Sequence, residues 1–197
     1  MNDRRLGVFG GSFDPVHAAH VALARVALDT LNLDALHWMP TGDAWQKTRK
    51  LTDATHRVAM LELAAQGEAR FRVDDRETRR AGATYTLDTV QELRAEHPAA
   101  QWFMVIGQDQ YARLHTWHRW RELLPLATWA VAGRAGDEPR APAEVAAVPH
   151  DVQPLPLAPI ALSATDIRAR IARGESIDGL VPPAVAAYIE RNHLYRS

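Results

Sequence analysis

The residues best suited to chemistry are two histidines, His17 and His20, that follow the glycine pair Gly10-Gly11. The glycines end a short apolar segment, residues 6–9, which has the composition of a buried strand. Apolar residues then recur at helical spacing, so both histidines fall in or near the first turn of a helix, on one face. That turn has free N–H groups and the positive end of the helix dipole, and the two imidazoles lie beside them. Such a site suits anionic oxygens, and phosphate is the foremost candidate.

This glycine turn matches neither of the two common phosphate-binding fingerprints. It lacks the G-x-G-x-x-G spacing of dinucleotide sites, and no Gly-Lys pair follows as in the P-loop. On the glycines alone, a tight strand-to-helix turn with two solvated histidines is an equally good interpretation. A metal site is less favoured, because the chain has no cysteine and no second His, Asp or Glu cluster of recognisable ligand spacing.

A second helix start near the end of the chain carries similar chemistry. Ser163 and Asp166 have the spacing of a capping box, which predicts that a helix begins there. The hydroxyls of Ser163 and Thr165 and the guanidinium of Arg168 then gather at its N-terminus, which again suits phosphate. We therefore expect the two helix starts to converge on one anionic ligand.

The most continuous apolar run, residues 101–106, ends at Gly107 and is followed by Asp109. In open α/β sheets, ligands lie beyond the carboxyl ends of the strands, where an acid accepts hydrogen bonds from ribose hydroxyls. Asp109 is therefore a candidate ribose contact, and N-capping of the next short helix is its alternative role. Thr86 has a similar alternative as the N-cap of the helix that follows it.

Two further segments combine aromatic and basic residues. Segment 115–121 places Trp117 and Trp120 beside cations; we assign Trp120 to the core and leave Trp117 free to stack on a ring. Segment 41–50 has no periodicity and mixes a tryptophan with three cations, Lys47 among them. It is either a loop that closes over an anionic ligand or, more simply, a solvated surface loop.

Strand-like and helix-like segments alternate along the whole chain. Strands are predicted at 6–9, 35–39, 71–73, 101–106 and 128–132, with helices starting near 17, 52, 86, 163 and 183. This pattern predicts an α/β fold, a doubly wound parallel sheet with helices on both faces. We interpret the charged run 74–80 as a solvated connection and segment 133–149, rich in alanine and proline, as a mobile excursion over the surface.

Length and composition narrow the class of protein. The chain has 197 residues, 47% of them hydrophobic, a net charge of −1 and no cysteine. These values predict one domain, residues 1–197, with a small C-terminal helical part over about 163–197, in a soluble cytoplasmic protein. The near-neutral charge does not favour a nucleic-acid or membrane-surface binder, and no apolar run is long enough for a membrane span. The oligomeric state stays open, with a homo-oligomer among the alternatives.

Three motifs in this order resemble those of a known family. They are Gly10-Gly-Ser-Phe-Asp-Pro-Val-His-Ala-Ala-His20, Gly107-Gln-Asp109 and Ser163-Ala-Thr-Asp-Ile-Arg168. They are similar to the motifs of bacterial nicotinate-nucleotide adenylyltransferases, which belong to the nucleotidyltransferases with an H-x-G-H motif and a Rossmann-like sheet. The resemblance implies adenylyl transfer from ATP to nicotinate mononucleotide, giving deamido-NAD and pyrophosphate in NAD biosynthesis, with Mg²⁺ as the cofactor.

The resemblance also implies roles for individual residues. His17, His20 and Arg168 are expected to hold the triphosphate and to stabilise charge during the transfer. The other ATP contacts it implies are Gly10, Gly11, Ser12, Phe13, Lys47, Gly107, Asp109, Ser163 and Thr165. Nicotinate mononucleotide is expected at Thr84, Tyr85, Thr86 and Trp117, with the Trp117 ring stacked on the pyridine. The phosphates, rather than protein side chains, are expected to hold most of the Mg²⁺ coordination.

The chain departs from the family pattern at two places. Ala19 stands where H-x-G-H has glycine, and its methyl group could crowd the approach of a phosphate to the helix. The usual Pro-Pro-His-Lys loop is replaced by Ala44-Trp-Gln-Lys47, which keeps only the lysine. These departures are the support for one rival function, a nucleotide-binding regulatory module without turnover. The other rival is an enzyme of the same superfamily with a different acceptor, such as phosphopantetheine adenylyltransferase.

Overall fold

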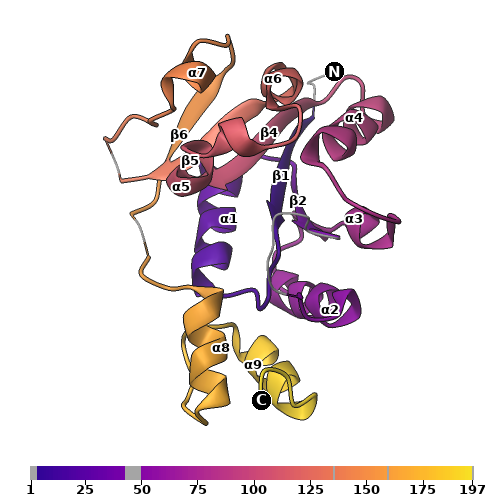
Figure 1. Cartoon of the computed structure of the whole chain (residues 1–197), viewed down its shortest axis with the longest axis vertical. Helices are drawn as coiled ribbons and strands as arrows, with labels where there is room; N and C mark the ends of the chain where they lie inside the picture. The colour runs from indigo at the N-terminus through magenta and orange to yellow at the C-terminus, as the bar shows by residue number, and fades with distance from the viewer. Residues whose placement is uncertain (1–3, 43–49, 135, 159, 197) are drawn as a thin grey trace.

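A six-stranded parallel sheet forms the centre of the molecule (Figure 1). The computed structural model describes residues 4–42, 50–134, 136–158 and 160–196. The strands are β1 (Arg5–Gly11), β2 (Ala35–Pro40), β3 (Phe71–Val73), β4 (Gln101–Gly107), β5 (Thr128–Gly133) and β6 (Val152–Pro156). Their spatial order is β3-β2-β1-β4-β5-β6, so the direction of winding reverses between β1 and β4. Open α/β sheets bind their ligands outside the carboxyl ends of the strands at such a point.

Helices cover both faces of this sheet. They are α1 (Ala18–Thr30), α2 (Ala54–Ala65), α3 (Arg76–Arg79), α4 (Thr86–Glu96), α5 (Gln108–Tyr111), α6 (Trp120–Leu123), α7 (Ala143–Ala146), α8 (Ala164–Ala172) and α9 (Pro183–Arg191). On one face α1, α2, α8 and α9 pack around Phe9 and Phe103, and on the other α4 to α7 pack around Val8 and Met104. Figure 1 shows α8 and α9 together at one end of the molecule, beyond α1 and α2. No helix within the described ranges is long and apolar enough to cross a membrane.

The predicted architecture, a doubly wound parallel sheet with helices on both faces and a C-terminal helical part, is confirmed. All five predicted strands are present, and the observed helices include the five that were expected. Gly67 and Gly174 follow α2 and α8 with φ of 87° and 71°, the left-handed conformation in which glycine ends a helix at no steric cost. Asp53 caps the start of α2, its Oδ1 accepting from the Thr55 N–H at 2.8 Å.

The segment after β5 is more ordered than its composition predicts. Within the range 133–149, expected to be a mobile excursion, α7 forms and buries Val145 completely. The strand β6 was not predicted; it pairs with β5 at the edge of the sheet. The strand contains two prolines, Pro154 and Pro156, which lack N–H groups. An edge strand tolerates prolines, but in the sequence they argue against a strand, which is why β6 was missed.

The charged run 74–80 is also not a solvated connection, and this prediction is wrong. It contains α3, and Glu77 is buried, its Oε1 accepting from Thr89 Oγ1 at 2.7 Å. Burial raises the pKa of the Glu77 carboxyl. Arg76 pairs at 2.8 Å with its neighbour Asp74 and also with Glu96 of α4, twenty positions later, so part of this charge is matched by a residue distant in sequence.

Candidate active site

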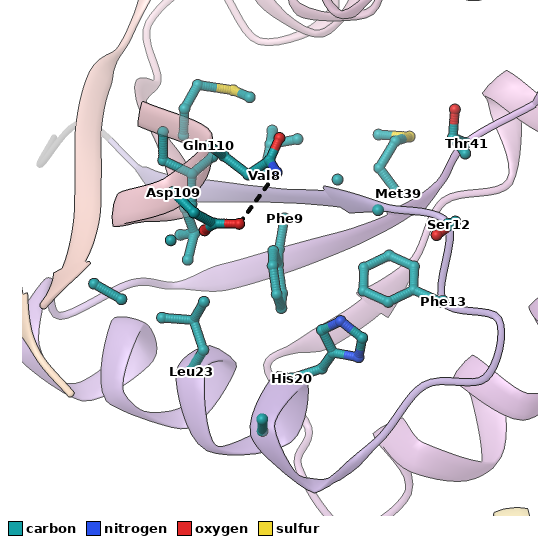
Figure 2. A pocket seen from close by; sticks show the side chains of 18 of the residues that line it. Val8, Phe9, Ser12, Phe13, His20, Leu23, Met39, Thr41, Asp109 and Gln110 are labelled. Carbon is teal, nitrogen blue, oxygen red and sulfur yellow. Dashed lines mark hydrogen bonds between the residues drawn. The ribbon is translucent and has the colours of Figure 1, made fainter. Parts of the chain in front are cut away.

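One cleft of about 1050 Å³ opens at the carboxyl ends of β1 and β4, where the strand order reverses. Figure 2 shows the His20 ring next to Phe13 in this cleft, with Asp109 of α5 farther along it. The predicted site residues that line the cleft are Gly10, Gly11, Ser12, Phe13, His17, His20, Thr84, Tyr85, Thr86, Gly107, Asp109, Trp117 and Ser163. Residues from both ends of the chain therefore share one cavity.

The turn between β1 and α1 is shaped by a strained residue and two glycines. Phe13 has a φ of 45°, in the left-handed region that a side chain disfavours, and its buried ring packs on Phe9 and Trp38. A Cβ at Gly11 would lie 2.9 Å from that ring, so Gly11 lets the ring fold back on its own turn. A Cβ at Gly10 would meet no atom within 4 Å. Gly10 therefore leaves space for a ligand rather than for a protein neighbour.

The histidine pair stands at the start of α1, as predicted. His17 is the N-cap, His20 lies in the first turn, and their rings stack with centroids 3.6 Å apart. The His17 backbone N–H donates to Nδ1 of His20 at 3.2 Å, which assigns the His20 proton to Nε2. Nδ1 of His17 is buried with no hydrogen-bond partner among the described residues. Ala19, between them, also lines the cleft, so the histidines and the added methyl group share the same space.

Burial keeps both imidazoles neutral in the protein without ligand. It lowers the pKa of His17 to about 4. It lowers the pKa of His20 to about 3, with a smaller contribution from repulsion by His17. The pair therefore presents neutral, pre-positioned N–H groups at neutral pH, and an anion in the cleft would favour their protonation.

The start of α8 borders the same cleft through Ser163. Its hydroxyl caps the helix, accepting from the Asp166 N–H at 3.1 Å, as the sequence predicts. Arg168 donates from Nη1 to the Asp14 carbonyl at 2.7 Å and from Nη2 to Oγ1 of Thr165 at 3.1 Å. Arg168 thus joins α8 to the loop before α1. Of the predicted residues at the start of α8, Ser163 lines the cleft, whereas Thr165 and Arg168 are not among its lining residues.

Asp109 follows the end of β4. Gly107, and not Asp109, is the N-cap of α5, so the alternative capping role for Asp109 is wrong. A Cβ at Gly107 would lie 2.8 Å from Asp109 Oδ1, so the glycine gives the carboxylate its place in the cleft. The neighbouring Gln108 bonds the backbone of Arg140 twice, at 2.7 and 3.0 Å, and holds the segment after β5 beside the site.

The far side of the cleft is lined by Thr84, Tyr85, Thr86 and Trp117. Tyr85 precedes α4, so Thr86 is the first residue of that helix rather than its N-cap. The half-buried Trp117 meets Trp129 edge-on at 6.1 Å, while Trp120 is buried in the core, as predicted. The Tyr85 ring stacks on the His118 ring, with centroids 4.0 Å apart. His118 also lines the cleft, and sequence reasoning missed it although it adjoins Trp117.

Sequence reasoning also missed a buried arginine behind the site. Arg57 is 3% exposed and bonds the carbonyls of Ser12, Thr41 and Thr52 at 2.8 to 3.1 Å. The sequence did carry a signal for its burial, because Arg57 lies at helical spacing from the buried Met60, Leu61 and Ala64 of α2. Lys47, predicted to contact ATP, lies outside the described residues.

Comparisons with known proteins agree with this arrangement. A sequence profile of the cytidylyltransferase-like family matches residues 8–170. A probable nicotinate-nucleotide adenylyltransferase of Methylibium petroleiphilum is 51% identical over 196 residues, which cover 98% of this chain and 92% of the relative. Another, from Bordetella pertussis, is 44% identical over 200 residues and covers 100% of both chains.

The fold has a counterpart among solved structures. Plasmodium falciparum nicotinic acid mononucleotide adenylyltransferase complexed with NaAD superposes with a TM-score of 0.79, covering 98% of this chain and 97% of the other. The two share 17% identity, so this likeness concerns the fold alone. The family profile and the two relatives, by contrast, match in sequence over most or all of the chain. The chain therefore belongs to the nicotinate-nucleotide adenylyltransferases of the cytidylyltransferase-like family.

Proposed function

We propose that this protein transfers the adenylyl group of ATP to nicotinate mononucleotide in the cleft at the ends of β1 and β4, releasing pyrophosphate and forming deamido-NAD. The observation that carries the proposal is the shared cleft, lined by the starts of α1 and α8, by Asp109 and by Trp117. Helix N-termini suit phosphates, the carboxylate suits ribose hydroxyls, and the indole suits a stacked pyridine ring.

The chemistry needs no nucleophile from the protein. A phosphate oxygen of nicotinate mononucleotide attacks the α-phosphorus of ATP, and the bond to the departing pyrophosphate breaks. The protein has to align the two anions and stabilise the charge that moves onto the leaving group. We assign this stabilisation to His17, His20 and Arg168, helped by the backbone amides of Ser12 and Phe13, the Ser163 and Thr165 hydroxyls and Lys47.

A divalent metal ion is typical of this family, and we propose Mg²⁺. The described residues contain no group of three or more His, Cys, Asp or Glu side chains placed to hold a metal. Mg²⁺ prefers phosphate oxygens and water with few carboxylates, which fits a metal that arrives on the triphosphate. When bound there, the ion would neutralise charge on the phosphates, and Asp109 is the cleft aspartate placed to contact it.

A panel of acceptors tests the function directly. The protein would be incubated with ATP, Mg²⁺ and nicotinate mononucleotide, nicotinamide mononucleotide or phosphopantetheine, and pyrophosphate release would be measured. Fastest release with nicotinate mononucleotide is expected. Preference for phosphopantetheine would favour the related adenylyltransferase, and no turnover with any acceptor would favour a regulatory module.

Replacing Trp117 with alanine is expected to raise KM for nicotinate mononucleotide by about tenfold to a hundredfold, since stacking on an aromatic ring contributes roughly 1–3 kcal/mol. KM for ATP should change by much less, because the assigned ATP contacts lie elsewhere in the cleft. Steady-state kinetics with each substrate varied in turn measures both values. An equal loss for the two substrates would contradict the stacking role.

Replacing Gly10 with alanine is expected to raise KM for ATP about tenfold while the melting temperature stays near that of the wild type. The added methyl group would enter open space in the cleft and meet no protein atom. Gly11→Ala is the matched control, because its methyl group would strike the Phe13 ring and lower stability. An unchanged KM in Gly10→Ala would place the phosphates elsewhere.

ATP binding is expected to take up protons at acidic pH. Both histidines are neutral in the free protein above their lowered pKa values of about 4 and about 3. A bound triphosphate raises these values, so uptake occurs between the free and bound pKa, and affinity increases as pH falls through that range. Calorimetry in buffers of different ionisation enthalpy measures the uptake. His17→Gln should take up fewer protons, and identical uptake would refute the assignment.

Two further predictions remain proposals. We propose that residues 1–197 form a single nucleotidyltransferase domain, supported by one sheet that contributes to both core clusters. We also propose a cytoplasmic location, supported by the absence of cysteine from the sequence, which fits a reducing compartment.

A further inference from the structure

The last residues of the chain reach back to the loop in front of α1. Tyr195 Oη donates to Oδ1 of Asp14 at 2.7 Å, across 181 residues of sequence. Burial and this hydrogen bond raise the pKa of the Tyr195 hydroxyl, so it stays protonated and remains a donor. Two residues of the terminal turn, His193 and Tyr195, have φ of 51° and 64°. Such left-handed backbone persists only where surrounding contacts fix it.

Asp14 is the acceptor through which several elements hold this loop. Its side chain is 1% exposed, and its Oδ2 accepts from the Thr52 N–H at 3.2 Å, just before α2. Its carbonyl accepts from Arg168 of α8, as described above. The start of α1 is bonded to the same C-terminal part, because the Ala18 N–H donates to the Leu180 carbonyl at 2.9 Å.

The loop that these contacts hold is strained and carries proposed phosphate donors. Phe13, with its positive φ, lies directly before Asp14, and Ser12 lies one residue earlier. A residue with a side chain is disfavoured in the left-handed region, so the loop needs external anchors. Donors that stabilise a transition state lose effect when they shift by a fraction of an ångström.

We infer that Tyr195 is a positioning residue, which holds the Ser12 and Phe13 amides in place for the triphosphate through its hydrogen bond to Asp14. The predicted effect on catalysis rests on the proposed function. The predicted effect on the loop rests only on the hydrogen bond between Tyr195 and Asp14. The end of the chain is thereby part of the active-site framework, although Tyr195 does not touch substrate.

Tyr195→Phe tests this role because it keeps the ring and removes only the hydroxyl. We expect kcat to fall about tenfold, equivalent to about 1.4 kcal/mol, with KM for nicotinate mononucleotide unchanged. The amides of Ser12 and Phe13 should also exchange their hydrogens faster in the protein without substrate. This second readout does not depend on turnover.

Tyr188→Phe is the matched control. Tyr188 lies in α9, and its hydroxyl is 3.0 Å from Nδ1 of His56 on α2, a similar half-buried bond that does not involve the loop. A merely structural effect would appear in both variants as an equal loss of melting temperature. The positioning role requires the loss of kcat and of amide protection in Tyr195→Phe alone.

An Asp14→Ala background completes the test. With the acceptor of the Tyr195 hydroxyl removed, adding Tyr195→Phe should lower kcat by less than about threefold further, since the bond between the two side chains is already absent. If Tyr195→Phe keeps both the kcat and the amide protection of the wild type, the inference is overturned. Absence of turnover in the wild type would instead refute the proposed function, while the exchange measurement would still decide the role of Tyr195.

Discussion

His20→Ala is expected to lower kcat/KM for adenylyl transfer by about a thousandfold while the fold survives. The His20 proton lies on Nε2 in a ring that the His17 backbone and the Phe9 and Phe13 rings hold in place. A fixed donor of this kind acts most strongly on charge that develops as pyrophosphate departs, so most of the loss should fall on kcat. Pyrophosphate release with each substrate varied gives kcat and kcat/KM, and a melting curve checks the fold.

His20→Gln separates the hydrogen bond from the charge. A glutamine amide supplies a neutral donor near the Nε2 position but cannot gain a proton when phosphate binds. We expect its rate to lie between those of the wild type and the alanine variant. A wild-type rate in His20→Ala would exclude the role assigned to this residue.

Arg168→Ala is expected to lower kcat/KM for ATP by about a hundredfold. The change removes a cation at the start of α8 and the bond at 2.7 Å to the Asp14 carbonyl. Loss of a charge-assisted hydrogen bond and displacement of the loop both weaken stabilisation of the transition state. Kinetics with ATP varied at saturating nicotinate mononucleotide measures the effect.

Two variants serve as controls for Arg168. Arg170→Ala removes a half-exposed arginine of the same helix that pairs with Glu175 at 3.8 Å, and it should leave the kinetics unchanged. Arg168→Lys keeps a charge but cannot bond Asp14 and Thr165 with one planar group, so we expect only partial activity. Equal rates in Arg168→Ala and Arg170→Ala would show that the two helix starts do not act together.

The helix starts were predictable because their signals are local. Ser163 caps α8 through the backbone of a residue three positions on, and the glycine pair before α1 marks the turn by its own conformational freedom. Each depends on neighbours within one helical turn. The placement of Arg168 beside Thr165, three residues earlier, followed from the same helical spacing.

The predictions for segments 74–80 and 133–149 were wrong because the burial of their side chains depends on residues far away in the sequence. Glu77 is buried because Thr89, twelve positions later, donates to it, and Val145 is buried because α7 packs beside α4 to α6. A charge or an alanine-rich stretch looks solvated until its distant partners are known. Composition alone could not supply those partners.

The α/β class, the positions of both helix starts suited to phosphate and, through three motifs, the family can be read from the amino-acid sequence alone. These depend on periodicity, caps and short spacings, which are properties of neighbouring residues. The folded chain was needed to show that contacts from the residue before α2, from α8 and from Tyr195 meet at Asp14, and that burial holds both histidines neutral. Contacts across up to 181 residues and the loss of hydration arise only when the sheet brings distant segments together.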